Sequence, residues 1–255
     1  MQDFRGLSRQ VWHQRYVAQA HWTHHIRQHI LKKINSVPGE RILEIGSGTS
    51  AVLTTLLREG YFNLSGIDID FPSLLFSKTS HDPFHLAQAD GMHLPFSAKT
   101  FGVTFCHFLL MWVESPSLIL EEMRRVTHAD GWVVALAEPD HHARIDYPLP
   151  LDELGKNQTQ ALKRQGVDVY MGRKLRSLFY QAGLVDVEVG ILGAQWNEQN
   201  DQTADQTEWT MIKADLGDQL TTDDLTQYHN LDRQARQTRE RILFIPTFYA
   251  FGKAI

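Results

Sequence analysis

The sequence predicts a doubly wound α/β domain with a mostly parallel sheet, and two patterns support this. Short apolar runs alternate with segments of helical periodicity along most of the chain. A glycine-rich turn follows the first apolar run, and acidic residues follow the second and third. Strands that alternate with helices build a parallel sheet with right-handed crossovers. The chain has 255 residues, which is enough for one such domain with additions.

Seven segments have the length and apolar character of strands, and turn residues separate several of them from the helical segments. The run at 101–110 is apolar throughout, as expected of a strand that is buried on both faces. We therefore expect a seven-stranded sheet. Its strands are predicted at residues 41–45, 62–67, 84–89, 101–110, 132–137, 185–192 and 243–253.

The helical segments begin with one long helix over 8–35, where apolar residues recur at spacings of three, four and seven. Residues 195–215 are rich in Asp, Gln, Thr and Asn, which predicts an exposed loop or a loosely packed helix rather than core. Further helices are predicted at 50–58, after Pro72, and at 115–127, 147–165, 172–182 and 220–241.

The composition excludes several classes of protein. A formal net charge of −5 and only short basic clusters argue against nucleic acid as a partner. The single cysteine, Cys106, allows no disulfide within the chain and no cysteine-based metal site. The first residues lack a signal-peptide pattern, and no apolar run approaches the roughly 20 residues that span a bilayer. We expect a cytoplasmic protein without a membrane partner.

Three histidines at positions 21, 25 and 29 fall on one face of the first predicted helix. This spacing could hold a metal ion, but no carboxylate or cysteine completes a ligand set. Solvated surface histidines are the favoured interpretation, so the sequence predicts no metal site.

The strongest motif runs from Leu43 to Ser50 and reads Leu-Glu-Ile-Gly-Ser-Gly-Thr-Ser, between the first strand and the next helix. Its glycines allow a tight turn and let a ligand lie against the main chain. Taken alone, the motif is also compatible with a simple strand-to-helix turn. Ligands of open parallel sheets bind outside the carboxyl ends of the strands, which is where this motif lies.

Two acidic residues strengthen the prediction of an adenosine site. Asp68 ends the second strand, where a carboxylate can accept hydrogen bonds from ribose hydroxyls. Capping of the following helix is the alternative role, but Asp70 can serve it and leave Asp68 for the ligand. Asp90 follows the third strand and could bind the exocyclic amine of an adenine, with Met92 over the ring.

Four segments, at 43–49, 66–68, 89–96 and 101–103, resemble in order and spacing the motifs of class I S-adenosylmethionine-dependent methyltransferases. The pattern is similar to the small-molecule branch that includes quinone-biosynthesis and natural-product enzymes. The resemblance implies a Rossmann-like methyltransferase fold and S-adenosylmethionine as the cofactor. The family often has a third glycine where this chain has Ser50. There we expect tighter packing without loss of binding.

We expect a single methyltransferase domain over residues 1–255, with an N-terminal helical lid at 1–38 and a helical cap. The core is expected at 39–194 and 242–255, and the cap or insertion at 145–170 and 195–241.

The resemblance implies a cofactor site made of loop backbone and a few side chains. The backbone at 46–48 would lie against the methionine part, with Glu44 near its amino group or organising the loop. Asp68 would bind the ribose and Tyr16 of the lid the methionine carboxylate. The full set is Tyr16, Glu44, Gly46, Ser47, Gly48, Asp68, Ile69 beside the adenine, Asp90, Gly91 and Met92 at the adenine edge, and Cys106 under the methionine end.

Candidate acceptor residues follow the fourth and fifth strands, at the same edge of the sheet. His141, Asp140 and His107 are candidate general bases, although loop residues that cap a helix are an alternative for each. Arg144 is a candidate anion clamp. Three residues are predicted to form an apolar wall of the acceptor pocket, with core packing as the alternative: Phe108, Met111 and Trp112. Further candidate lining residues are Tyr147, Tyr170 and Arg173.

The sequence therefore predicts a methyltransferase that acts on an O, N or C atom of a small-molecule acceptor, as a monomer or a homodimer. The alternatives are a cofactor-binding protein without transferase activity and an aminopropyl transferase. A nicotinamide enzyme is disfavoured because Glu44 would oppose a pyrophosphate at the helix N-terminus. No Asn/Asp-Pro-Pro-Tyr/Phe sequence follows the fourth strand, which also argues against a nucleic-acid substrate.

Overall fold

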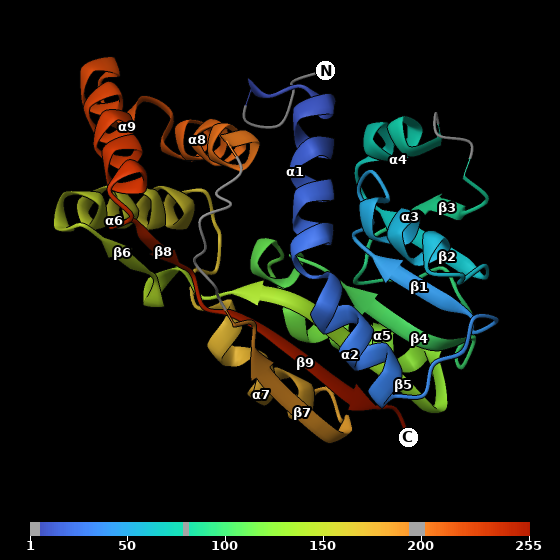
Figure 1. Cartoon of the computed structure of the whole chain (residues 1–255). Helices are drawn as coiled ribbons and strands as arrows, with labels where there is room; N and C mark the ends of the chain where they lie inside the picture. The colour runs from blue at the N-terminus through green and yellow to red at the C-terminus, as the bar shows by residue number, and fades with distance from the viewer. Residues whose placement is uncertain (1–5, 79–81, 194–201) are drawn as a thin grey trace.

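The computed structural model describes residues 6–78, 82–193 and 202–255. Its centre is a seven-stranded sheet of order β3-β2-β1-β4-β5-β9-β7, and within this described sheet only β9 is antiparallel to its neighbours (Figure 1). The mostly parallel seven-stranded sheet is confirmed, and its strand order reverses between β1 and β4. The strands are β1 Ile42–Ile45, β2 Leu64–Asp68, β3 His85–Gln88, β4 Phe101–Cys106, β5 Thr127–Pro139, β7 Val185–Ile191 and β9 Thr247–Lys253.

Helices cover both faces of this sheet. On one face, α2 (His24–Lys33) and α3 (Ala51–Arg58) enclose a core that Phe105 of β4 joins. On the other, α5 (Pro116–Val126) and α7 (Met171–Gln181) enclose a second core that contains Cys106. Successive strand residues point to opposite faces, so β4 must be apolar at both kinds of position. A further helix, α4 (Phe71–Lys78), packs against β2 and β3.

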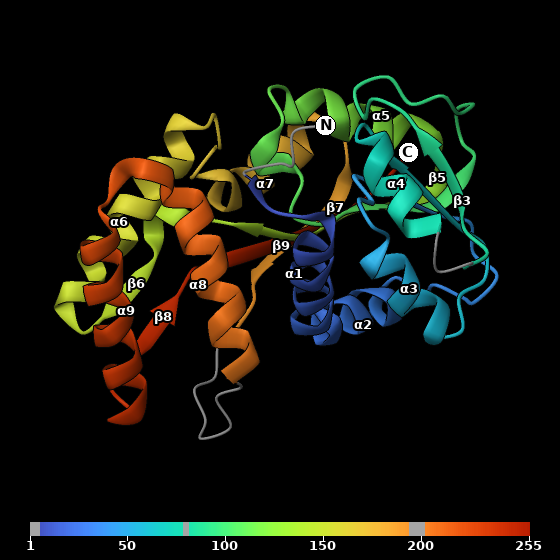
Figure 2. The same ribbon diagram turned by 90° about the horizontal axis from the view of Figure 1, so that it is seen from above.

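The N-terminal helix differs from the prediction because it is broken at Thr23. The helix α1 (Arg9–Trp22) ends there and α2 begins at the next residue. The buried Thr23 hydroxyl donates to the Gln19 carbonyl at 2.8 Å and also contacts His107, so the break occurs where the chain meets β4. Figure 2 shows α1 standing between the core and the helices of the cap. Helical periodicity alone cannot reveal a one-residue break between two helices.

The cap consists of α6 (Leu149–Arg164), α8 (Gln202–Leu216), η4 (Gly217–Gln219), α9 (Thr222–Gln237) and a two-stranded sheet of β6 (Ile145–Tyr147) and β8 (Ile242–Phe244). The expectation that residues 195–215 lie outside any core is wrong for the described part. Trp209, Ile212 and Leu216 of α8 are buried against Leu151 of α6. These apolar residues recur at spacings of three and four, so one face of α8 is apolar although the segment is polar in composition. Residues 194–201 lie outside the described residues.

The predicted final strand at 243–253 is two strands. β8 pairs with β6 in the cap, whereas β9 pairs with β5 and β7 in the main sheet. Ile245 and Pro246 separate the two strands. Proline has no amide N–H to donate to a ladder, which explains why the pairing changes at this point.

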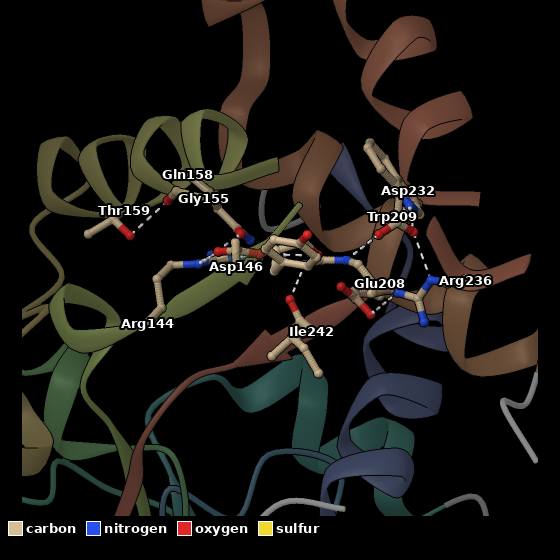
Figure 3. A network of polar contacts seen from close by, with 12 residues as sticks. Arg144, Asp146, Gly155, Gln158, Thr159, Glu208, Trp209, Asp232, Arg236 and Ile242 are labelled. Atoms are coloured by element: carbon tan, nitrogen blue, oxygen red, sulfur yellow. Dashed lines mark hydrogen bonds and ion pairs between the residues drawn. The ribbon is translucent and has the colours of Figure 1, made fainter. Parts of the chain in front are cut away.

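A network of buried ion pairs joins the elements of the cap (Figure 3). Asp146 of β6 accepts from Arg144 at 2.6 Å and from Arg241 at 2.9 Å. Arg241 also donates to Asp232 of α9 at 2.5 Å, and Asp232 accepts from the Trp209 indole of α8 at 3.0 Å. The network therefore connects β6, α8 and α9 through side chains that are almost fully buried.

None of the helices in the described ranges is long and apolar enough to cross a membrane.

The buried pairs give a prediction for stability. The Asp146 side chain is 1% exposed and its partners Arg144 and Arg241 are 7% and 5% exposed. Asp146→Ala leaves the buried Arg144 guanidinium without its carboxylate and Arg241 with Asp232 alone, and we expect it to lower the free energy of unfolding by about 3 to 5 kcal/mol. Urea denaturation measures this. Asp152→Ala, which removes a surface partner of Lys156, is the control with little expected effect. Equal stability of the two variants would contradict the prediction.

Candidate functional site

The glycine loop, residues 46–50, lies between β1 and α3 at the carboxyl edge of the sheet. Gly46 and Gly48 have φ values of 73° and 50°, in the left-handed region that favours glycine. A Cβ on Gly46 would lie 2.8 Å from Leu109, so this side of the loop is also closely packed. The Gly46 and Ser47 amides both donate to the Ile67 carbonyl at 2.9 Å, which fixes the loop to β2.

Ser50, which stands where the family often has glycine, has a φ of 60°. It occupies the N-cap position of α3, but its side chain makes no capping hydrogen bond. The left-handed conformation explains why glycine is suited to this position. Ser50 therefore adopts this conformation at a cost in strain.

Asp68 at the end of β2 is hydrogen-bonded to the glycine loop. Its Oδ2 accepts from the Gly48 amide at 2.7 Å, and its Oδ1 accepts from the Asp70 amide at 2.8 Å. Burial raises the pKa of Asp68, while the amide hydrogen bonds act in the opposite direction. The Asp70 carboxylate instead accepts from the Ser73 hydroxyl at 2.6 Å, near the start of α4. Asp68 therefore binds the glycine loop, whereas the Asp70 side chain binds the first turn of α4.

Asp90 and its neighbours follow β3 beside Asp68. The Ala89 amide donates to the Asp68 carbonyl at 3.1 Å, and the Asp90 carboxylate accepts from the Met92 amide at 2.9 Å. A Cβ on Gly91 would lie 2.7 Å from Ile119, so the chain passes close to α5 there. Ile69 is 70% exposed. The residues expected around the adenine therefore lie together at one end of the glycine loop.

Glu44 and Cys106 lie beneath the loop. Glu44 is 2% exposed, and its Oε2 has no hydrogen-bond partner among the described residues. Burial and the nearby Asp68 carboxylate raise the pKa of Glu44 well above its ordinary value. Burial likewise raises the pKa of Cys106, so its thiol stays protonated near neutral pH. The neighbouring carboxyl groups of Glu44 and Asp68 favour a ligand that carries positive charge.

The first helix lies directly over the glycine loop. A Cβ on Gly48 would lie 3.3 Å from the Tyr16 ring, and His13 Nδ1 is 2.8 Å from the Thr49 hydroxyl. One turn earlier, Arg9 donates to Asp70 at 2.7 Å. These contacts place α1 as a cover on the predicted cofactor site.

The segment after β4, residues 107–112, is called the β4 loop below. His107 Nε2 lies 3.0 Å from the Thr23 hydroxyl, and burial with the nearby Arg27 charge lowers the pKa of His107 to about 3. Phe108 has a φ of 53° and its ring is near Trp22 of α1, with 6.3 Å between ring centroids. Met111 is 3% exposed and belongs to the core, whereas Trp112 is 38% exposed. Met111 therefore packs in the core, which was the alternative to a place in the apolar wall.

The end of β5 holds a second group of predicted residues. Asp140 is 1% exposed and forms a two-point ion pair with Arg173, with one contact of 2.8 Å. Asp140 also accepts from the Ala143 amide at 3.1 Å and so caps the short helix η3 (His141–Ala143). Arg173 lies over the Tyr170 ring at 5.2 Å. Asp140 is therefore engaged in structure, which disfavours it as a base.

Arg144 and Tyr147 lie in the cap, away from this group. The Arg144 guanidinium donates to Asp146 and, at 2.6 Å, to Gln158 of α6. Its charge is neutralised inside the protein, which disfavours Arg144 as an anion clamp. Tyr147 on β6 is 50% exposed.

The three histidines of the N-terminal segment do not form a ligand set. His21 is on α1 and His25 and His29 are on α2, and all three are exposed. Among residues 6–78, 82–193 and 202–255, no three His, Cys, Asp or Glu side chains could hold a metal ion.

One residue of this edge was not predicted from the sequence. Glu138 of β5 is 0% exposed and accepts hydrogen bonds from three amides of the β4 loop. Its position at a strand end was visible, but its partners lie 27 to 29 residues earlier in the chain.

The fold and this edge define an α/β protein with a predicted site for an adenosine cofactor, and comparisons with known proteins show what it is similar to. A family model described as a methyltransferase domain matches residues 43–135. The chain is 27% identical to the demethylmenaquinone methyltransferase of Streptomyces griseus over 108 residues, 42% of this chain and 46% of that protein. It is 31% identical to the phosphatidylethanolamine N-methyltransferase of Cereibacter sphaeroides over 117 residues, 44% of this chain and 55% of that one.

The solved structure of geranyl diphosphate methyltransferase in complex with S-adenosylmethionine has a TM-score of 0.56 to this chain at 12% identity. The match covers 94% of this chain and 85% of that one, and it shows the shared fold. The chain spans about half the length of the curated relatives it matches. The matched residues 43–135 contain the motifs that resemble those of class I S-adenosylmethionine-dependent methyltransferases.

The packing of the glycine loop gives a testable prediction. Gly46→Ala would force a positive φ on alanine and press its methyl group on Leu109, so we expect a loss of about 1 to 3 kcal/mol in unfolding free energy. Thermal unfolding measures this. Gly193→Ala is the matched control, because nothing lies within 4 Å of the added methyl group. A Gly46→Ala variant as stable as this control would show that the loop conformation is not constrained.

Proposed function

We propose that this chain binds S-adenosylmethionine at the glycine loop and transfers its methyl group to an O, N or C atom of a small-molecule acceptor. The observation that carries the proposal is the junction of Gly48 with Asp68, because it joins two family motifs at the carboxyl edge of the sheet. The relatives' acceptors, a menaquinone precursor and a phospholipid amine by their names, differ from one another. They support the class of reaction and leave the acceptor open.

The residues present fit the cofactor. S-adenosylmethionine supplies an electrophilic methyl group and carries both an ammonium and a sulfonium charge. Glu44 keeps a buried oxygen without a partner among the described residues, and Asp68 lies close enough to raise its pKa. Uncompensated buried carboxyl groups favour a cation and disfavour a pyrophosphate, so the same residues argue against a nicotinamide cofactor.

Each part of the site then has a proposed role. The backbone of Gly46, Ser47 and Gly48 receives the methionine part, and Glu44 binds its amino group. Asp68 binds the ribose, whose hydroxyls replace some of the hydrogen bonds that the carboxylate now accepts from the Gly48 and Asp70 amides. Ile69, Asp90, Gly91 and Met92 surround the adenine, with Cys106 beneath the methionine end.

The lid helix α1 closes this site. Tyr16 lies against Gly48, so cofactor entry requires α1 to move away from the loop. In the closed position α1 excludes water from the methyl group. Alignment and water exclusion are the main contributions that an enzyme makes to methyl transfer.

The acceptor is proposed to bind on the side of the β4 loop that faces away from the glycine loop, between Phe108, Trp112 and the residues around Tyr170. A base is needed only if the acceptor must lose a proton early. His107 has a pKa of about 3 and is a weak base at neutral pH, and Asp140 is paired with Arg173. His141, on the short helix after β5, is therefore the preferred candidate of the three.

Cofactor binding can be tested without knowing the acceptor. We expect Asp68→Ala to weaken the binding of S-adenosylhomocysteine by at least about tenfold, since it removes a charge-assisted contact with the ribose. Isothermal titration calorimetry measures the affinity, and thermal unfolding checks that the variant is folded. Asp223→Ala, on the exposed side of α9, is the control. Unchanged affinity in Asp68→Ala would remove Asp68 from the site.

Turnover is tested with methyl-labelled S-adenosylmethionine and a library of metabolites that includes quinones, phenols and amines. We expect label in a small molecule. Label only in protein or nucleic acid would contradict the proposed acceptor class. Tight cofactor binding with no transfer to any acceptor would favour the alternative, a binding protein without transferase activity.

A further inference from the structure

A buried carboxylate at the end of β5 holds the β4 loop. Glu138 Oε1 accepts from the Leu109 and Leu110 amides, both at 2.9 Å, and its Oε2 accepts from the Met111 amide at 3.2 Å. These three successive N–H groups lie at the start of the short helix η2 (Leu110–Trp112) and would otherwise lack partners within it. One side chain therefore fixes the backbone of half the loop.

The β4 loop in turn touches several parts of the site. Leu109 packs against Gly46 of the glycine loop, and His107 contacts Thr23 at the end of α1. On the far side, the Met111 carbonyl accepts from the Asp168 amide at 2.9 Å, next to α7. A displacement of this loop would therefore change the cofactor side, the lid and the acceptor side together.

An ionisable group is an expensive choice for this position. Glu138 is fully buried and forms no ion pair with any residue that the structure describes. Burial raises the pKa of Glu138 to about 7, against the three amide hydrogen bonds that lower it. A carboxyl whose folded pKa is raised costs stability once it ionises, so the protein is less stable as the pH rises through 7. The benefit of the charge must therefore lie elsewhere.

That benefit is the number of acceptors. A carboxylate offers lone pairs on both oxygens and no donor, which matches three converging N–H groups. A glutamine side chain would face the Met111 amide with its own N–H groups. A protonated carboxyl keeps acceptor lone pairs but loses the charge that strengthens its hydrogen bonds. The ionised form of Glu138 therefore holds the native loop conformation most firmly.

We propose that Glu138 is a positioning residue, which holds the β4 loop so that Phe108 and Trp112 face the acceptor while Leu109 supports the glycine loop. This role rests on the proposed methyltransferase function. It predicts that the loop loosens when the carboxylate is removed or protonated, with the rest of the fold retained.

The other titratable groups around Glu138 can be separated from it. Cys106 on β4 stays protonated and His107 stays neutral near pH 7, and Asp140 of β5 is paired with Arg173 of α7. Glu44 on β1 is a second buried carboxyl with a raised pKa. Glu44→Gln is therefore included as a background that removes this second buried carboxyl, so that its titration cannot account for a pH effect on the loop.

The test is hydrogen–deuterium exchange of the full-length protein, followed by mass spectrometry of peptides that span residues 107–113. We expect Glu138→Gln to raise exchange in these peptides by about tenfold, with β1 and α3 unchanged. Glu121→Gln, the same change on an exposed residue of α5, is the control. In the wild type and in Glu44→Gln, protection of the loop, corrected for intrinsic rates, should fall as the pH drops from about 8 to about 6.

Equal protection of the loop in wild type and Glu138→Gln would overturn the proposal, as would a loss of protection spread evenly over β5 and α7. If Glu138→Gln does not fold, the pH series on the wild type decides the matter. With an acceptor in hand, we expect kcat to fall at least about tenfold, and the affinity for S-adenosylhomocysteine to fall by a smaller factor because Leu109 still packs beside Gly46. A wild type that binds no S-adenosylhomocysteine would instead refute the proposed function, whatever the exchange shows.

Discussion

The hydrogen bond from the Gly48 amide to the Asp68 carboxylate is the contact on which the rest of the site depends. At 2.7 Å it joins the loop after β1 to the end of β2, so two neighbouring parallel strands present one surface. The left-handed conformations of Gly46 and Gly48 bring the main chain to this position. The lid uses the same place, since the Tyr16 ring lies against Gly48. The glycine loop, the Asp68 carboxylate and helix α1 therefore meet at a single glycine.

Charge is distributed differently in the two halves of the molecule. At the glycine loop, Glu44 is buried and Asp68 is half-buried close to it, and two neighbouring carboxyl groups suit a cationic ligand. In the cap, arginines and aspartates neutralise one another through direct pairs. The cap charges thus serve to join its elements, and they leave Arg144 unsuited to an anionic acceptor. On the β4 loop, Trp112 is exposed and Phe108 is half-buried, so apolar surface is present beside the glycine loop.

The parts of the site that could be predicted from the sequence are those carried by short-range motifs. Gly46, Gly48, Asp68 and Asp90 lie at or within three residues of strand ends, and the carboxyl ends of parallel strands meet at one edge. The roles of Asp140 and Arg144 could not be predicted in this way. Asp140 pairs with Arg173, which lies 33 residues away, and no local pattern indicates such a partner. The role of Glu138 could not be predicted either, because its partners on the β4 loop are also distant in the sequence.

The sequence by itself determined the parallel sheet, the position of the glycine loop and the resemblance to a methyltransferase family, because strand periodicity and motif spacing are local properties of the chain. Only the tertiary structure decided where the first helix breaks, which strand residues 242–244 join and which charged groups are free to act. Those outcomes depend on contacts between distant segments, and a buried charge is available for chemistry only if folding has not already provided it with a partner.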